Sequence, residues 1–388
     1  MENDRSRFYH PELDCLRFVA FLSIFIYHLD QQFHSVVAPN SPLQWMVLCL
    51  IKSGIFGVDL FFCLSSFLIT MLLLREHDVR GTIDVRAFWI RRILRIWPLY
   101  YAFLLFSAMV SPYWLGQQAF SSVRLFHYWF FLGNWDVVWH DWHHSPVLPL
   151  WSISVEEQFY LVWPLLLVAV KPKRILFLAV AALIGANIYH LLHHPAVFKN
   201  QWANTFYHVD PIAWGAIGAW LAHTGRLNLS LLIRPVLLLT GLFVIPAYFY
   251  YQGFQSFFDG KDLVIYPISA LCCLLIVISL YDLKAVAWDS VVMKFWAFLG
   301  RISYGLYVFH MLAITWVILQ LYGHGFYNGE VLGMFAGIKA VGSAAILLLT
   351  IVLALVSYRF LETPFLKLKK KYTYIPSAPQ TTVKGAAL

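Results

Sequence analysis

The chain has 388 residues, of which 60% are hydrophobic and 12% are charged, and its mean hydropathy is +0.67. Soluble domains carry about 25% charged residues, so this composition excludes an ordinary soluble protein and predicts an all-α, polytopic bundle of transmembrane helices in a lipid bilayer. The net charge of +8 does not indicate a nucleic-acid partner, because the basic residues lie in short segments between apolar runs.

Apolar runs of about 20 residues, the length that crosses a bilayer as a helix, recur along the whole chain. They predict about ten transmembrane helices, near residues 15–34, 44–74, 97–113, 148–170, 175–192, 207–223, 235–251, 263–281, 299–321 and 331–357. An even number of spans puts both termini on one side, and 22 of the 28 Lys and Arg residues fall there. We therefore expect cytoplasmic termini, with a cytoplasmic segment 1–13, a transmembrane domain 14–361 and a basic tail 362–388.

Arg17 and His28 lie on the first predicted helix, which begins near Asp14. Eleven residues at 1.5 Å each separate them by about 16 Å and make close to three turns, so both side chains share one helix face. His28 then lies near the middle of the bilayer, where ionisable groups are costly and usually functional.

Asp59 lies within the apolar run from Gly54 to Ile69. A carboxylate in such a run needs a partner or must be neutral, so Asp59 either pairs with an arginine or orients a catalytic histidine. Gly54 and Gly57 on the same run allow another helix to approach closely.

Three arginines, Arg91, Arg92 and Arg95, precede a further apolar helix. Arg91 and Arg95 are four residues apart on one helix face, and guanidinium groups bind phosphate through paired hydrogen bonds. Anchoring at the cytoplasmic surface explains one or two such residues, whereas three close together favour a bound cytoplasmic polyphosphate.

Consecutive carboxylates, Glu156 and Glu157, lie within the predicted span 148–170. Neighbouring helical residues point about 100° apart, so at most one glutamate faces an internal cavity, and the other needs Ser152, Tyr160 or an arginine as a partner. A buried glutamate can transfer protons, although a structural ion pair with the arginines explains the same pattern.

Ser303, Tyr307 and His310 line one face of the predicted span 299–321. His310 lies about 15 Å from the inner edge of that span, a depth similar to that of His28. Glu157 enters from the outer side and reaches the same level. These three helices together indicate a site in the middle of the membrane.

The outer connection from about residue 110 to 148 is rich in tryptophan and histidine. Such rings form belts at the membrane interface, and they also suit the wall of a sugar-binding site. Residues His140, His143 and His144 on a loop are weak evidence for a metal, and we expect none. The five cysteines have no metal or disulfide spacing and are expected to pack.

These segments resemble the acyltransferase-3 family of integral-membrane O-acyltransferases. The similar motifs, in order, are residues 14–28, 57–69, 91–95, 151–160 and 303–310. Two positions depart from the family pattern, because Ser66 stands where glycine is usual and His208 stands where an arginine precedes Asp210. Some relatives carry a C-terminal extracytoplasmic SGNH/esterase-like domain; this chain continues into a short basic tail, so we expect none here.

The resemblance implies transfer of an acyl group, most simply acetyl, from cytoplasmic acyl-CoA to a hydroxyl of a cell-surface polysaccharide, peptidoglycan or secreted glycoside, at a bacterial inner membrane. Acetyl-CoA is then a donor substrate, and no permanent cofactor is expected. The expected catalytic residues are His28, Glu157, Asp59 and His310; the acyl-CoA-binding residues are Arg17, Arg91, Arg92 and Arg95; the supporting residues are Asp14, Ser152, Glu156, Tyr160, Ser303 and Tyr307.

In the expected mechanism, His28 removes the acceptor proton or takes the acyl group itself, and Glu157 or Asp59 holds its imidazole in the useful tautomer. The sequence does not choose between these routes, nor does it identify the acceptor or exclude a homodimer. The alternative function is a multi-span transporter or flippase for a glycan or lipid-linked substrate, which would also use many spans and buried charges.

Overall fold

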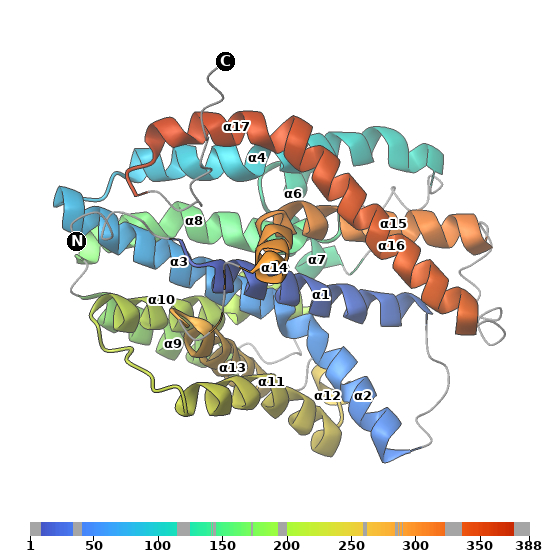
Figure 1. The fold of residues 1–388 in the computed structure, drawn as a ribbon, viewed down its shortest axis with the longest axis horizontal. Helices are drawn as coiled ribbons and strands as arrows, with labels where there is room; N and C mark the ends of the chain where they lie inside the picture. The colour runs from blue at the N-terminus through green and yellow to red at the C-terminus, as the bar shows by residue number, and fades with distance from the viewer. Residues whose placement is uncertain are drawn as a thin grey trace.

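A computed structural model describes residues 9–33, 41–114, 125–140, 142, 145–171, 174–192, 200–258, 262–283, 286, 288, 290–322 and 336–375. All regular structure in these residues is helical, and most of the long helices run along the long axis of the molecule (Figure 1). The predicted all-α helical bundle is therefore confirmed.

The helices have the following bounds. They are α1 (Pro11–Phe33), α2 (Pro42–Ser53), α3 (Gly57–Arg80), α4 (Val85–Trp114), α6 (Leu125–Trp129), α7 (Gly133–His140), α8 (Leu150–Val170), α9 (Ile175–Leu192), α10 (Val209–His223), α11 (Ile233–Gln252), α12 (Gln255–Phe258), α13 (Ile265–Leu280), α14 (Val291–Arg301), α15 (Ser303–Tyr322), α16 (Ala336–Ser357) and α17 (Thr363–Lys369). A π-helical turn, Tyr358–Glu362, joins α16 to α17.

Each of the ten predicted spans coincides with a helix or a pair of helices. In the described residues, six helical stretches are long and apolar enough to cross a membrane, and the bent pair α14 and α15 makes a seventh. The chain is therefore a multi-pass membrane protein. The full count of ten spans and the cytoplasmic side of the termini remain predictions.

Three predicted spans differ in detail from the structure. The span 44–74 is interrupted by a short turn, Gly54–Phe56, between α2 and α3. The span 299–321 is broken, since α14 and α15 meet at an angle of 68°. Helix α4 begins at Val85 rather than near residue 97, because its arginine-rich first turns are helical although they are not apolar.

Helix α1 lies at the centre of the bundle and contacts α3, α14 and α15 (Figure 1). A Cβ atom on Gly57 would lie 2.6 Å from the Ala20 carbonyl oxygen, and one on Gly300 would lie 1.7 Å from that of Asp14. Side chains cannot come so close, so these glycines allow the backbones to cross in contact. The predicted close approach at Gly57 is confirmed.

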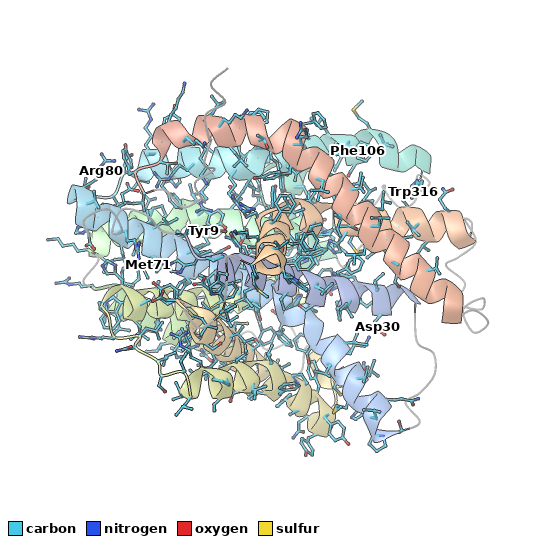
Figure 2. The ribbon with its side chains drawn as sticks, viewed as in Figure 1. Tyr9, Asp30, Met71, Arg80, Phe106 and Trp316 are labelled. Carbon is cyan, nitrogen blue, oxygen red and sulfur yellow. The ribbon has the colours of Figure 1, made fainter. Side chains whose placement is uncertain are left out.

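Two groups of helices flank this centre. Helices α9, α10, α11 and α13 pack together on one side, with α10 against α3, while α4, α16 and α17 lie on the other (Figure 1). Figure 2 places Arg80, at the end of α3, at the opposite end of the molecule from Asp30, Phe106 and Trp316. We refer to these as the Arg80 end and the Asp30 end.

Candidate functional site

A cavity of about 70 Å³ lies between α1, α3, α4, α8 and α15. Eight of the side chains predicted for the site line it: Arg17, Arg92, Arg95, Ser152, Glu156, Tyr160, Ser303 and Tyr307. Apolar and aromatic residues, among them Val58, Phe61 and Phe62 of α3, complete the wall. Ser65 of α3 also lines the cavity, so five helices far apart in the sequence bring polar residues of all five sequence motifs to one place.

The cavity has an excess of positive charge, because Arg17, Arg92 and Arg95 line it together with one carboxylate, Glu156. Arg17 forms an ion pair with Asp14 at 3.6 Å, and the Arg92 guanidinium lies over the ring of Tyr160, 5.1 Å from its centre. The salt bridges of the described residues include Arg17, Arg80 and Arg91 but neither Arg92 nor Arg95. Because a partly buried cation without a counter-ion is costly, these two arginines suit an anionic ligand.

Arg91 has a different environment from its neighbours. Its Nη2 lies 2.9 Å from Glu76 Oε2 in an ion pair, and its Nη1 donates to the backbone carbonyl of Tyr372 at 2.7 Å. Arg91 does not line the cavity. Arg91 therefore lies apart from the cavity that Arg92 and Arg95 line, because its guanidinium is paired elsewhere, and its role in binding acyl-CoA remains a prediction.

Of the two consecutive glutamates, Glu156 faces the cavity. Its Oε1 accepts a hydrogen bond from Ser65 at 2.6 Å. Glu157 points instead toward α4, where its Oε2 accepts from the indole N–H of Trp97 at 2.9 Å. One glutamate of the pair lines the cavity, as expected, but the partner of the other is Trp97 and not Ser152, Tyr160 or an arginine.

His28 and His310 lie side by side, with ring centres 5.3 Å apart. The Nδ1–H of His310 donates to the backbone carbonyl of Tyr307, and this bond assigns the lone pair to Nε2. Among the described residues, that buried Nε2 atom has no hydrogen-bond partner. The histidine pair thus presents a free basic nitrogen in an apolar setting.

Tyr307 connects the cavity to the histidine pair. Its hydroxyl group shares a hydrogen bond with Ser152 at 2.7 Å on the cavity wall, and its ring centre lies 5.3 Å from that of His310. Phe61, another wall residue, packs edge-on against Tyr307. The cationic cavity and the histidine pair are therefore neighbours, separated by one aromatic side chain.

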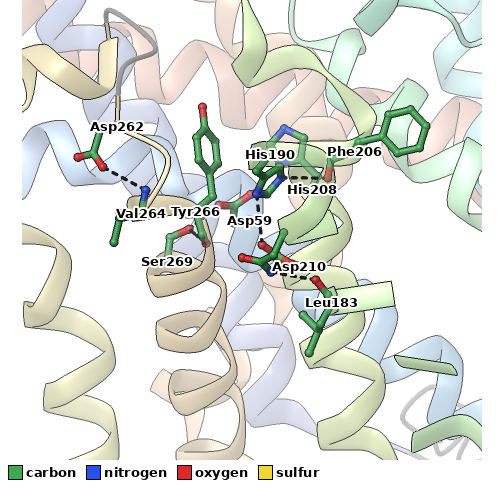
Figure 3. Close-up of polar contacts among 11 residues, drawn as sticks. Asp59, Leu183, His190, Phe206, His208, Asp210, Asp262, Val264, Tyr266 and Ser269 are labelled. Atoms are coloured by element: carbon green, nitrogen blue, oxygen red, sulfur yellow. Dashed lines mark hydrogen bonds and ion pairs between the residues drawn. The ribbon is translucent and has the colours of Figure 1, made fainter. Parts of the chain in front are cut away.

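Asp59 pairs with His208, not with His28 (Figure 3). The His208 Nδ1 lies 2.8 Å from Asp59 Oδ1 and its Nε2 lies 2.6 Å from the carbonyl oxygen of Trp202, so both nitrogens face acceptors and the ring donates from both. Ser269 donates to the second oxygen of Asp59 at 3.1 Å. The pair is fully buried.

These contacts correct the expected second partner of His28. Neither Asp59 nor Glu157 orients the imidazole of His28, because each carboxylate is bonded to a different group, His208 and Trp97 respectively. His310 is the ionisable neighbour that the structure gives to His28.

Sequence reasoning missed a network centred on Gln158. Its amide donates to Asn134 Oδ1 and to the Phe131 carbonyl, both at 2.9 Å, and its Oε1 accepts from Thr205 at 2.7 Å. The network ties α7 and the turn before α10 to α8. The available signal was a third polar residue directly after two glutamates in an apolar helix.

The aromatic outer segment is only partly described. Trp129 stacks on Tyr101 with ring centres 5.4 Å apart, and Trp139 is half exposed. His143 and His144 lie outside the described residues. In the part of the chain that is described, no cluster of histidine, cysteine and acidic side chains is arranged to hold a metal ion.

The fold and the site define a multi-pass membrane protein with an arginine-lined cavity beside a histidine pair. The family profile described as an acyltransferase domain matches residues 10–359. The chain therefore belongs to the acyltransferase-3 family.

Two bacterial relatives illustrate the similarity. The chain is 28% identical over 398 residues to the peptidoglycan O-acetyltransferase OatA of Listeria monocytogenes, covering 93% of this chain and 56% of that protein. It is 28% identical over 389 residues to the O-acetyltransferase OatA of Staphylococcus aureus, covering 95% of this chain and 59% of that protein. The chain thus spans less than two thirds of the length of the curated relatives that it matches. No solved structure matches it significantly.

Proposed function

We propose that this protein is a membrane O-acyltransferase that moves an acetyl group from cytoplasmic acetyl-CoA to a hydroxyl of a carbohydrate acceptor. The observation that carries this proposal is that a cavity lined by Arg92 and Arg95, which form no salt bridge within the described residues, lies one side chain away from a histidine pair. Acetyl-CoA brings phosphates for the arginines and a thioester for the histidines.

The chemistry needs a base near neutral pH, and histidine suits that requirement. The acceptor hydroxyl oxygen attacks the thioester carbonyl carbon, while an imidazole of the His28–His310 pair removes its proton. The C–S bond breaks, the coenzyme A thiolate leaves and a proton returns to the sulfur. The free Nε2 of His310 can take a proton from His28, so the two rings would share this task.

Three findings support the acceptor class and the membrane. The family is one of acyltransferases, two relatives are named as O-acetyltransferases, one of them of peptidoglycan, and both come from bacteria. We extend these names to this chain as a glycan hydroxyl acceptor at a bacterial cytoplasmic membrane.

Replacement of His28 tests the proposal. His28→Ala in purified, membrane-reconstituted protein should lower transfer from radiolabelled acetyl-CoA to a glycan acceptor by at least about 100-fold, the usual loss for a general base. His223→Gln is the matched control. His223 is partly exposed, and its salt bridge within the described residues is with Asp78. Retained transfer in a folded His28→Ala protein would contradict the assignment.

A further inference from the structure

The hydroxyl groups that line the cavity differ in what their protons do. Ser65 donates to Glu156 Oε1 at 2.6 Å, and the Tyr304 hydroxyl donates to a backbone carbonyl of α4 at 2.8 Å. The hydroxyl groups of Tyr307 and Ser152 instead bond to each other at 2.7 Å, and either of them can be the donor. This pair can therefore rearrange its protons without losing the bond between its two oxygens.

Ser152 has a second acceptor, which makes this rearrangement possible. Its Oγ also donates to the carbonyl oxygen of Pro149 at 3.1 Å, and the backbone N–H of Ser152 donates to the same oxygen at 3.4 Å. When the serine hydroxyl turns to Tyr307, the Pro149 carbonyl keeps a backbone donor. The phenolic proton of Tyr307 is then available to a ligand in the cavity.

Tyr307 stands between the cavity and the histidine pair. It lines the cavity together with Arg92 and Arg95, its ring centre lies 5.3 Å from that of His310, and the ring of His28 lies next to His310. A thioester held at its phosphates by the arginines and attacked beside the histidines has its carbonyl group close to this side chain. The Tyr307 hydroxyl is thus placed to meet the carbonyl oxygen.

Apolar side chains hold the Tyr307 ring in place. Phe61 packs edge-on against it with ring centres 6.0 Å apart, and Val58 and Phe62 line the same cavity. The residue is only 7% exposed. A hydrogen-bond donor that is already fixed in a water-poor site stabilises a developing negative charge more strongly than one in water.

We propose that Tyr307 is a further catalytic residue, whose hydroxyl donates a hydrogen bond to the thioester carbonyl oxygen, and that Ser152 is the positioning residue that directs it. This inference rests on the proposed function. When the acceptor oxygen attacks the carbonyl carbon, an electron pair of the C=O bond moves to the carbonyl oxygen, and Tyr307 stabilises this oxyanion while it keeps its own proton. The C=O bond then re-forms, the C–S bond breaks, and the sulfur receives the proton that the imidazole removed.

Tyr307→Phe in full-length, membrane-reconstituted protein tests the hydroxyl, because the ring that packs on Phe61 and His310 is kept. Loss of one oxyanion donor should lower kcat by about 100- to 1,000-fold. The KM for acetyl-CoA should stay within a few-fold, since the bond strengthens in the transition state. Tyr248→Phe is the matched control and should keep its kcat, because the Tyr248 hydroxyl donates to Asp262 at 2.7 Å, outside the cavity.

Ser152→Ala tests the positioning role. It should lower kcat by at most about tenfold, the effect of one neutral hydrogen bond, with little change in KM. Because Ser152 acts through Tyr307, the double variant should be no slower than Tyr307→Phe alone. Losses that multiply in the double variant would assign Ser152 a role independent of Tyr307 and overturn this part of the inference.

Three outcomes would overturn the role of Tyr307 while the proposed function stands. They are an unchanged kcat in folded Tyr307→Phe, a loss that appears in KM alone, and a radiolabelled acetyl group bound covalently to Tyr307 when acceptor is withheld. The last would make the hydroxyl a nucleophile. If the unmodified protein transfers no acetyl group from acetyl-CoA, the proposed function fails and this inference fails with it.

Discussion

Single residues of one motif have separate roles, and the arginines of α4 show this most clearly. Arg91 is paired with Glu76 and donates to the backbone carbonyl of Tyr372. Arg92 and Arg95 line the cavity instead. Under the proposed function, a guanidinium in the cavity should act on donor binding, because the proposed donor carries phosphates.

We expect Arg95→Ala to raise the KM for acetyl-CoA by about ten- to 100-fold, as for the loss of a hydrogen bond between charged groups. The KM for the acceptor should change little. Steady-state kinetics with each substrate varied in turn measures both values. The control is Arg86→Ala, because Arg86 is exposed on the same helix. Equal effects of Arg95→Ala on both KM values would argue against a donor site.

His208 shows how one residue can replace the arginine expected from the family pattern. Its ring donates to Asp59 and to the Trp202 carbonyl, which are two acceptors that an arginine side chain also satisfies. His208 therefore gives Asp59 a hydrogen-bonding partner inside the bundle. The departure noted in the sequence keeps a nitrogen-bearing side chain beside Asp59.

Replacing His208 tests this role. His208→Gln should destabilise the protein by about 3–5 kcal/mol, the usual cost of leaving one member of a buried ion pair without its partner. His208→Arg should retain most of the stability. Thermal unfolding in detergent compares the two variants, and similar midpoints for both would show that the charge of the ring is unimportant.

Among the elements, α4 illustrates how a helix extends beyond its apolar run. Asp84 precedes the first residue of α4, and its Oδ1 accepts from the Ala87 N–H at 2.9 Å, which caps the helix. Its other oxygen accepts from Tyr374. The helix cap and the hydrogen bond from Tyr374 together stabilise the first turns of α4, which carry the arginines and which apolar periodicity alone did not predict.

The Asp84 cap has a defined pH dependence. The Ala87 N–H bond, with Tyr374 and Arg80, holds the pKa of Asp84 below its usual value. Since the folded pKa is lower than the unfolded one, its stabilisation is complete above the unfolded pKa of about 4 and is lost as the pH falls through the folded value.

Asp84→Ala should therefore lower the stability by about 0.5–2 kcal/mol at pH 7, and the difference from the unmodified protein should shrink below about pH 4. Thermal midpoints measured at several pH values check both statements. Asp84→Asn keeps a capping side chain and should lose less at neutral pH. A deficit that stays constant down to acidic pH would contradict the assigned cap.

At the scale of the whole molecule, the direction of transfer follows from the distribution of charge. The first turns of α4, which carry the arginine motif, and helix α17 lie toward the Arg80 end of the molecule (Figures 1 and 2). Most basic residues of the sequence also belong to this side of the predicted topology, which the positive-inside rule places in the cytoplasm. The donor would then enter from the cytoplasm.

Sealed vesicles containing the protein test this orientation. Cytoplasmic-side-out vesicles should use externally added acetyl-CoA, whereas vesicles of the opposite orientation should use it only when it is loaded inside. Detergent permeabilisation is the control and should remove the difference. Donor use from the opposite face alone would reverse the assigned orientation, and solute uptake without acetyl transfer would favour the transporter.

The sequence alone was sufficient for the all-α membrane architecture and for most of the polar residues of the site. Apolar runs and charged residues within them are strong local signals, because a bilayer tolerates few unpaired charges. The motif residues Arg17, Arg92, Glu156 and Tyr307 did come together in one cavity. The resemblance to the family is confirmed over residues 10–359.

Only the tertiary structure decided which of these polar groups are partners. The break between α14 and α15, the pairing of Asp59 with His208 and the contacts of Arg91 with Glu76 and Tyr372 all depend on residues that are distant in the chain. Helical periodicity fixes the face on which a side chain lies, but not the helix that this face meets. The physical reason is that pairing energies arise only where separate helices pack together, and a linear pattern contains no record of that packing.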